Sequence, residues 1–100
     1  MDLHGIQFDS SVLAAFCRGR GIRKLALFGS VLRDDFGPER DVDILVEFDP
    51  ARIPTLLGMA EMEMELSAMV GRKVDLRTPE DLSVYFREAV ARTARVQYAA

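Results

Sequence analysis

The sequence is poor in the residues on which several kinds of site depend. It has one cysteine, Cys17, and one histidine, His4, among its 100 residues. A single cysteine excludes an intramolecular disulfide, and without a Cys/His cluster we expect neither a structural zinc site nor a Ser-His-Asp triad. We expect Cys17 to be a small buried side chain and His4 to lie in an N-terminal tail.

Long apolar runs and a leader pattern are also missing. No uninterrupted apolar stretch approaches the ~20 residues that a membrane-spanning helix needs. Residues 1–5 lack a basic region followed by an apolar one, so they do not resemble a secretory signal. We therefore expect no membrane segment and a cytoplasmic location.

The composition favours one globular domain over residues 1–100. Hydrophobic residues make up 49% of the chain, enough for a core, while seven Gly and four Pro exclude a low-complexity chain. Thirteen basic and sixteen acidic residues give a net charge of −3. This balance argues against non-specific binding of long nucleic acid, although it permits a local site for a small anion.

Apolar periodicity alternates between helical and strand spacing along the chain. The order predicts an α/β or α+β fold in which helices pack on a small sheet. The predicted elements are a helix from Ser10 or Ser11 to about Arg20, a strand 23–28, a helical turn 31–35, a strand 42–48, a helix from Ile53 or Thr55 to Val70, a strand 73–77, a helix capped by Thr78 and running to about Thr93, and a short strand 95–98.

The helix that ends at Val70 has apolar residues on more than one side. One stripe is predicted to face the core, and it comprises Met59, Met62, Leu66, Met69 and Val70. Leu57 and Met64 lie on a second side, which is either buried within the domain or open to a partner. We expect Glu61, Glu63 and Glu65 to form a solvated face, and Tyr85 and Tyr98 to be packing residues and not modification sites.

Gly29 and Ser30 stand between a predicted strand and a helical turn. Glycine lets backbone approach a ligand closely, and the start of a helix offers free N–H groups that suit a phosphate. The Ser30 hydroxyl and the Arg33 guanidinium, one turn later, would add phosphate contacts. The alternative is a tight turn with a capping serine and a solvated Arg33.

Acidic residues recur at strand spacing in the second half of the chain. Asp41 and Asp43 would share one face of the strand 42–48, because residues i and i+2 of a strand point the same way. Asp75 points away from its apolar neighbours, and it would join them if its strand lies beside theirs. Grouped carboxylates suit Mg²⁺ or Mn²⁺ and metal-assisted phosphoryl or nucleotidyl transfer. The alternative is a set of solvent-facing aspartates.

Together, Gly29-Ser30, Arg33, and Asp41-x-Asp43 followed by an apolar 44–46 resemble the signature of the DNA polymerase β-like nucleotidyltransferase superfamily. Within it the chain is similar to the minimal nucleotidyltransferases, the antitoxin half of HEPN–MNT toxin–antitoxin pairs. The family's third acidic residue lies in a Val-Asp-Leu strand like the one that holds Asp75. The resemblance implies a small mixed sheet with helices packed on it.

The resemblance also implies roles for these residues. Asp41 and Asp43 would hold two Mg²⁺ ions, or Mn²⁺, and through them ATP. Asp75 would bind the catalytic metal and activate the acceptor hydroxyl, while Gly29 and Ser30 cradle phosphates with Arg33 nearby. The implied reaction transfers AMP from ATP to a tyrosine of a HEPN-type toxin, which is a ribonuclease, and thereby inactivates it.

Two positions depart from the family pattern. Arg40 replaces a common serine and Asp34 replaces a frequent glycine, although neither change removes a metal ligand. Arg40 would contact a phosphate, pair with Asp34 or Asp35, or crowd the metal site. Two other functions stay open, an antitoxin that acts by binding alone and a small-molecule nucleotidyltransferase. A homo- or hetero-oligomer is compatible with each.

Overall fold

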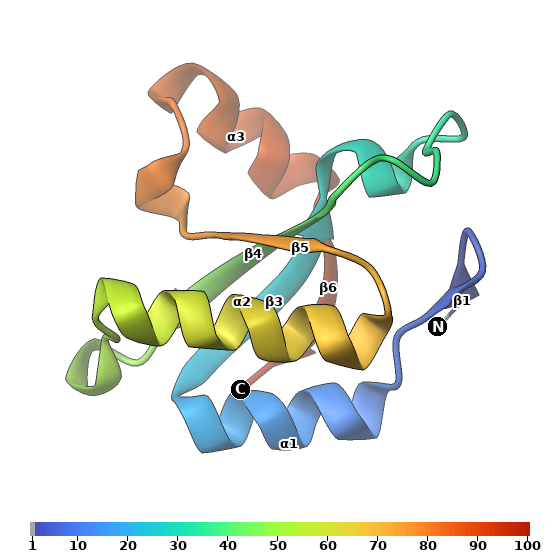
Figure 1. Ribbon diagram of the computed structural model, residues 1–100. Helices are drawn as coiled ribbons and strands as arrows, with labels where there is room; N and C mark the ends of the chain where they lie inside the picture. The colour runs from blue at the N-terminus through green and yellow to red at the C-terminus, as the bar shows by residue number, and fades with distance from the viewer. Residues whose placement is uncertain (1) are drawn as a thin grey trace.

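The computed structural model describes residues 2–100 and shows helices packed on a small mixed sheet, as predicted (Figure 1). Met1, the first residue of the predicted domain, lies outside the described residues. The strands are β1 Asp2–Leu3, β2 Ile6–Gln7, β3 Ile22–Phe28, β4 Val42–Phe48, β5 Val74–Arg77 and β6 Arg95–Ala99. The helices are α1 Ser10–Arg20, α2 Leu56–Val70 and α3 Val84–Thr93, and the short 3₁₀ turns are η1 Gly29–Leu32, η2 Pro50–Arg52 and η3 Pro79–Asp81.

Four strands form the main sheet, in the order β5-β4-β3-β6. β3 pairs antiparallel with both β4 and β6, whereas β4 and β5 run parallel. The parallel pair is possible because α2 carries the chain back from the end of β4 to the start of β5. β1 and β2 form a separate hairpin at the N-terminus, which the sequence did not predict.

The core lies between the sheet and the two helices α1 and α2, which cover the same face (Figure 1). Alternate residues of the strands point into it, so Ile44 of β4 and Leu76 of β5 are buried there beside Leu13 and Cys17 of α1. Burial of Cys17 was predicted and is confirmed. The opposite face of the sheet is covered only in part, by α3, and among the described residues none of α3 is buried.

The starts of α1 and α3 differ from the prediction, because side chains other than the expected ones cap them. Asp9, rather than Ser10 or Ser11, caps α1 by accepting hydrogen bonds from two backbone N–H groups. The predicted helix from Thr78 to Thr93 is two elements. Thr78 and Asp81 form a capping box at the start of η3, and Ser83 caps the start of α3.

The structure decides one open alternative and corrects two further expectations. Leu57 and Met64 are 71% and 74% exposed, so the second side of α2 is not buried within the domain. Tyr85 is 88% exposed and does not pack in the interior, whereas Tyr98 packs against the core. His4 is no loose tail, because its Nε2 lies 2.9 Å from the carbonyl oxygen of Val31.

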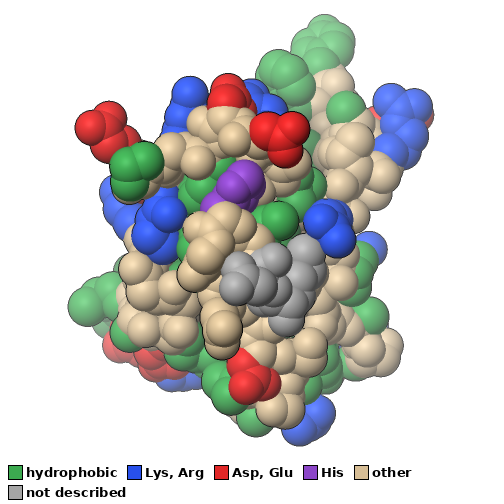
Figure 2. Space-filling model, turned by 90° about the vertical axis from the view of Figure 1, so that its right-hand side faces the viewer, with side chains coloured by type: hydrophobic (Ala, Val, Ile, Leu, Met, Phe, Trp, Pro, Cys, Tyr) green, Lys and Arg blue, Asp and Glu red, His purple; other side chains and the backbone are tan. Residues whose placement is uncertain are grey.

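The single histidine, which lies in the turn between β1 and β2, is visible on the face of the molecule that Figure 2 shows. Its ring lies 5.1 Å from that of Phe36, which ties the hairpin to the segment between β3 and β4. Within residues 2–100, no helix is both long and apolar enough to cross a lipid bilayer.

Candidate functional site

Asp43 and Asp75 lie side by side on the sheet face opposite α1 and α2. Asp43 is opposite Asp75 in the parallel register of β4 and β5, and it is opposite Phe28 in the antiparallel register of β3 and β4. The neighbours of each aspartate point into the core, so strand alternation turns both carboxylates to the other face. The sequence predicted this shared face, on condition that the two strands are adjacent, and they are.

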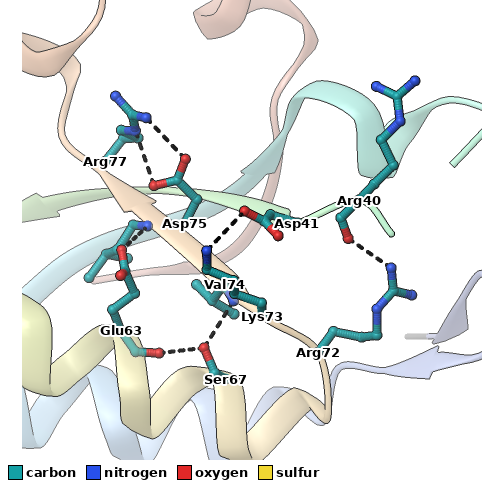
Figure 3. A network of polar contacts seen from close by, with 10 residues as sticks. Arg40, Asp41, Glu63, Ser67, Arg72, Lys73, Val74, Asp75 and Arg77 are labelled. Atoms are coloured by element: carbon teal, nitrogen blue, oxygen red, sulfur yellow. Dashed lines mark hydrogen bonds and ion pairs between the residues drawn. The ribbon is translucent and has the colours of Figure 1, made fainter. Parts of the chain in front are cut away.

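Two side chains of α2 hold the strand that carries Asp75. The Glu63 carboxylate accepts a hydrogen bond from the backbone N–H of Leu76 at 2.8 Å, and the Ser67 hydroxyl accepts one from Val74 at 2.9 Å (Figure 3). β5 is an edge strand, and these bonds satisfy N–H groups that no further strand pairs. The prediction that Glu63 belongs to a solvated face is therefore wrong, because it positions β5.

Burial, and after it repulsion between carboxylates, determines the electrostatics of Asp43. Burial raises the pKa of Asp43, and the neighbouring Asp75 raises it further, while Arg77 opposes the shift. Within residues 2–100, no hydrogen bond or ion pair holds the Asp43 side chain. It is thus a half-buried carboxylate with a like charge beside it, an arrangement that a bound cation would stabilise.

The other two carboxylates have cationic partners. The Arg77 guanidinium donates to both oxygens of Asp75, at 3.2 Å from Nε and 3.0 Å from Nη2. Lys73 Nζ lies 3.7 Å from Asp41 (Figure 3). Asp41 precedes β4 and turns towards Lys73, so the sequence expectation of three carboxylates in one group is met in this conformation only for Asp43 and Asp75.

Gly29 follows β3 directly and touches the carboxylate of Asp43. Its φ is +75°, and a Cβ atom built on it would lie 2.6 Å from Asp43 Oδ2. A side chain here would be strained by the backbone conformation and would also collide with the carboxylate. The missing Cβ of Gly29 therefore accommodates the carboxylate of Asp43. The predicted approach of the Gly29 backbone to a phosphate stays a prediction.

The remaining predicted residues surround this centre without joining it. Ser30 lies half-buried in η1, a single 3₁₀ turn rather than the helical turn expected at 31–35. Arg33 is exposed, and its guanidinium binds both oxygens of Asp35, at 3.0 and 3.2 Å. The Arg40 guanidinium points away from Asp41, and its carbonyl oxygen accepts a bond from Arg72 (Figure 3). Arg40 does not crowd the carboxylates.

The carboxylates suit a hard divalent cation by chemistry. Within residues 2–100, no three Asp, Glu, His or Cys side chains are arranged as ligands of one ion. Asp43 and Asp75 nevertheless present carboxylate oxygens side by side, and the missing Cβ of Gly29 leaves room next to Asp43. Oxygen ligands of this kind fit Mg²⁺ or Mn²⁺, with Asp41 available after it leaves Lys73.

A hollow of about 240 Å³ continues along the same sheet face. It lies between the sheet and α3, and Leu45, two residues after Asp43, forms part of its floor. Most of the residues that line it are apolar. The hollow is therefore a separate concavity on the same sheet face, and neither Asp43 nor Asp75 lines it.

Comparison with known proteins concerns the sequence and the fold as a whole. The sequence model described as a nucleotidyltransferase domain matches residues 10–96. The protein adenylyltransferase MntA of Thermococcus cleftensis is 39% identical over 72 residues, which are 72% of this chain and 71% of that protein. A solved structure described as a minimal nucleotidyltransferase is 32% identical, with a TM-score of 0.70 over 85% of each chain. A toxin–antitoxin structure with AMP-PNP is similar in fold alone, with 18% identity and a TM-score of 0.73 over 93% of this chain and 75% of that one.

Proposed function

Because the chain belongs to the family of nucleotidyltransferase domains, we propose that it transfers AMP from ATP to a hydroxyl group of a partner protein. The observation that carries this proposal is the pairing of Asp43 and Asp75 on the sheet face that α1 and α2 leave open. The partner we propose is a HEPN-type toxin, with a tyrosine as acceptor and with this chain as the antitoxin. The name of the Thermococcus relative and the toxin–antitoxin structures of the same fold support this choice.

The roles proposed for the residues come from the family resemblance, and the pairing of Asp43 with Asp75 supports them. Asp43 and Asp75, joined by Asp41, would hold Mg²⁺, which neutralises charge on the entering and leaving oxygens. Gly29 and Ser30 would border the phosphates, and Arg33 would reach them after it leaves Asp35. Asp75, held in place through β5 and α2, would orient the acceptor hydroxyl and take up its proton.

The reaction is then a displacement at the α-phosphorus. The acceptor oxygen forms a bond to this phosphorus, the bond to the bridging oxygen of the β-phosphate breaks, and pyrophosphate leaves. The hydroxyl proton passes to the site carboxylate or to solvent. We also propose that the protein is cytoplasmic and that residues 1–100 form a single domain.

A label-transfer assay tests the proposed reaction. The chain is incubated with Mg²⁺ and α-labelled ATP in a lysate of its own host, beside the Asp43→Asn and Glu47→Gln variants. Glu47 is the matched control, because it lies on the same strand and the same face but pairs with Lys24 at 3.8 Å. We expect wild type and Glu47→Gln to label one protein band, and Asp43→Asn to lose at least 100-fold of this activity.

The controls separate the alternatives. Asp43→Asn should fold at least as stably as wild type, because burial already disfavours the charge of Asp43. Label from γ-labelled ATP would indicate phosphoryl transfer and contradict the proposal. Undiminished labelling by Asp43→Asn would also contradict it. If Asp43→Asn labels nothing and still neutralises the toxin fully, the function is inhibition by binding. Mass spectrometry of the labelled band identifies the acceptor residue.

A further inference from the structure

Arg77 binds the carboxylate of Asp75 with both arms of its guanidinium. The two residues are two positions apart on β5 and therefore share a face, and the N–O distances are 3.2 and 3.0 Å. The planar fork of arginine matches the two oxygens of a carboxylate, so this pair engages both oxygens at once. Those are the oxygens that a divalent cation would need.

The charge of Arg77 acts on more than its direct partner. Arg77 shares a sheet face with Asp43 as well, because Asp43 is opposite Asp75 in the parallel register of β4 and β5. It therefore offsets the repulsion between the two neighbouring carboxylates, as Lys73 does for Asp41 at 3.7 Å. In this conformation Arg77 and Lys73 supply Asp75 and Asp41 with the positive charge that a bound metal ion would otherwise supply.

Asp75 is the only described residue that binds the Arg77 side chain directly, although the charges of Asp43 and Asp81 also attract it. Within residues 2–100 its only ion pair and its only side-chain hydrogen bonds are with Asp75, and the side chain is 47% exposed. Its release therefore requires the loss of one partner and no rearrangement of the core. The neighbouring backbone stays fixed, because Glu63 holds the N–H of Leu76.

We propose that Arg77 occupies the cation position on Asp75 in the metal-free protein and is displaced when a divalent cation binds. This inference rests on the proposed function, because the cation is the one that the transfer reaction uses. Arg77 is accordingly a positioning residue: it keeps the two carboxylates together before the metal arrives and competes with the metal for Asp75.

Metal titration without nucleotide tests this competition directly. The full chain, stripped of metal with a chelator, is titrated with Mn²⁺, and free Mn²⁺ is measured by electron paramagnetic resonance. We expect Arg77→Gln to bind Mn²⁺ about tenfold more tightly than wild type, because the substitution frees both oxygens of Asp75 and removes a positive charge that repels the ion. Arg77→Lys should bind about two- to threefold more tightly, because lysine keeps the charge but loses the fork.

Two matched variants locate the effect. Arg23→Gln removes an exposed arginine of β3 that has no ion pair within residues 2–100, and we expect its affinity to stay within twofold of wild type. Asp43→Asn, alone or with Arg77→Gln, should lose most of the Mn²⁺ binding. An Arg77→Gln affinity equal to that of wild type or of Arg23→Gln overturns the inference. Weaker Mn²⁺ binding by Arg77→Gln than by wild type also overturns it, and so does the absence of Mn²⁺ binding in both proteins.

The label-transfer assay on the same preparations separates this inference from the proposed function. If AMP transfer depends on Asp43 but Mn²⁺ affinity does not change in Arg77→Gln, the proposed function holds and the competition between Arg77 and the metal is refuted. Tighter Mn²⁺ binding by Arg77→Gln without transfer by wild type leaves the competition standing and removes the adenylyltransferase assignment.

Discussion

Replacement of Gly29 by alanine separates the chemistry of the site from the stability of the fold. Gly29 has a φ of +75°, and its added Cβ would lie 2.6 Å from Asp43 Oδ2. The carboxylate is the end of a rotatable side chain, so it can move away at little energetic cost. To reach an ordinary contact of 3.4 Å, however, the oxygen has to retreat by about 0.8 Å from its place beside Asp75.

Gly71 provides the control for the backbone. It ends α2 with a φ of +74°, and a Cβ there would meet no atom within 4 Å. Alanine in this left-handed region costs about 1–2 kcal/mol at either position. For a domain of this size each kcal/mol lowers Tm by about 4–8 °C, so both variants should melt about 4–16 °C below wild type.

Only Gly29→Ala should lose activity beyond its loss of stability. A displacement of about 1 Å in a reacting geometry costs about 100-fold in rate, which is the loss we expect for AMP transfer. Gly71→Ala should transfer AMP within about threefold of wild type at a temperature where it is folded. Melting is followed by circular dichroism and transfer by initial rates of labelling. Equal transfer rates for the two variants would refute the argument that the missing Cβ preserves the position of Asp43.

Two further predictions concern the support of the site and the core. Glu63→Ala removes the acceptor of the Leu76 N–H and should cost about 1–2 kcal/mol and speed hydrogen exchange at that amide, whereas Glu61→Ala, on the exposed side of α2, should change stability by less than about 0.5 kcal/mol. Equal exchange rates in the two variants would contradict this role. Burial raises the pKa of Cys17 to about 11 from an ordinary value of 9.0, so the thiol should resist alkylation at pH 8 until the protein unfolds. Because the folded pKa is the higher one, its contribution to stability is complete below pH 9 and is lost as the pH rises towards 11, a loss that Cys17→Ala should lack when the two melting curves are compared.

The period of a strand was enough to predict much of the candidate site. Alternation placed Asp43 and Asp75 opposite their apolar neighbours, and the strand 42–48 was predicted with the bounds that the structure has. Whether the two aspartates meet depends on which strands are adjacent. Local pattern does not determine this, because it is set by the path of α2 across the sheet.

The error at Glu63 has a physical reason. Three glutamates at alternating positions look like a solvated face, yet Glu63 and Ser67 are one turn apart and border the apolar stripe that contains Met62 and Leu66. A polar i, i+4 pair beside a core stripe can satisfy the free N–H groups of an edge strand. The spacing of Glu63 and Ser67 is visible in the sequence, but their role can be recognised only once an edge strand is known to lie against α2.

The cations of the site differ in how far the sequence could reveal them. Arg77 follows Asp75 by two residues, so the rule that put the aspartates on one face also puts Arg77 there, and this pair could have been predicted. The contact of Lys73 with Asp41 requires the parallel register of β4 and β5, because the two residues are far apart in the chain. A cluster of carboxylates in a metal-free protein needs positive charge nearby, and a search for such a site should therefore include arginine and lysine at strand spacing from each aspartate. In this chain Arg77 lies at that spacing from Asp75, and its replacement tests directly whether the carboxylates bind a cation.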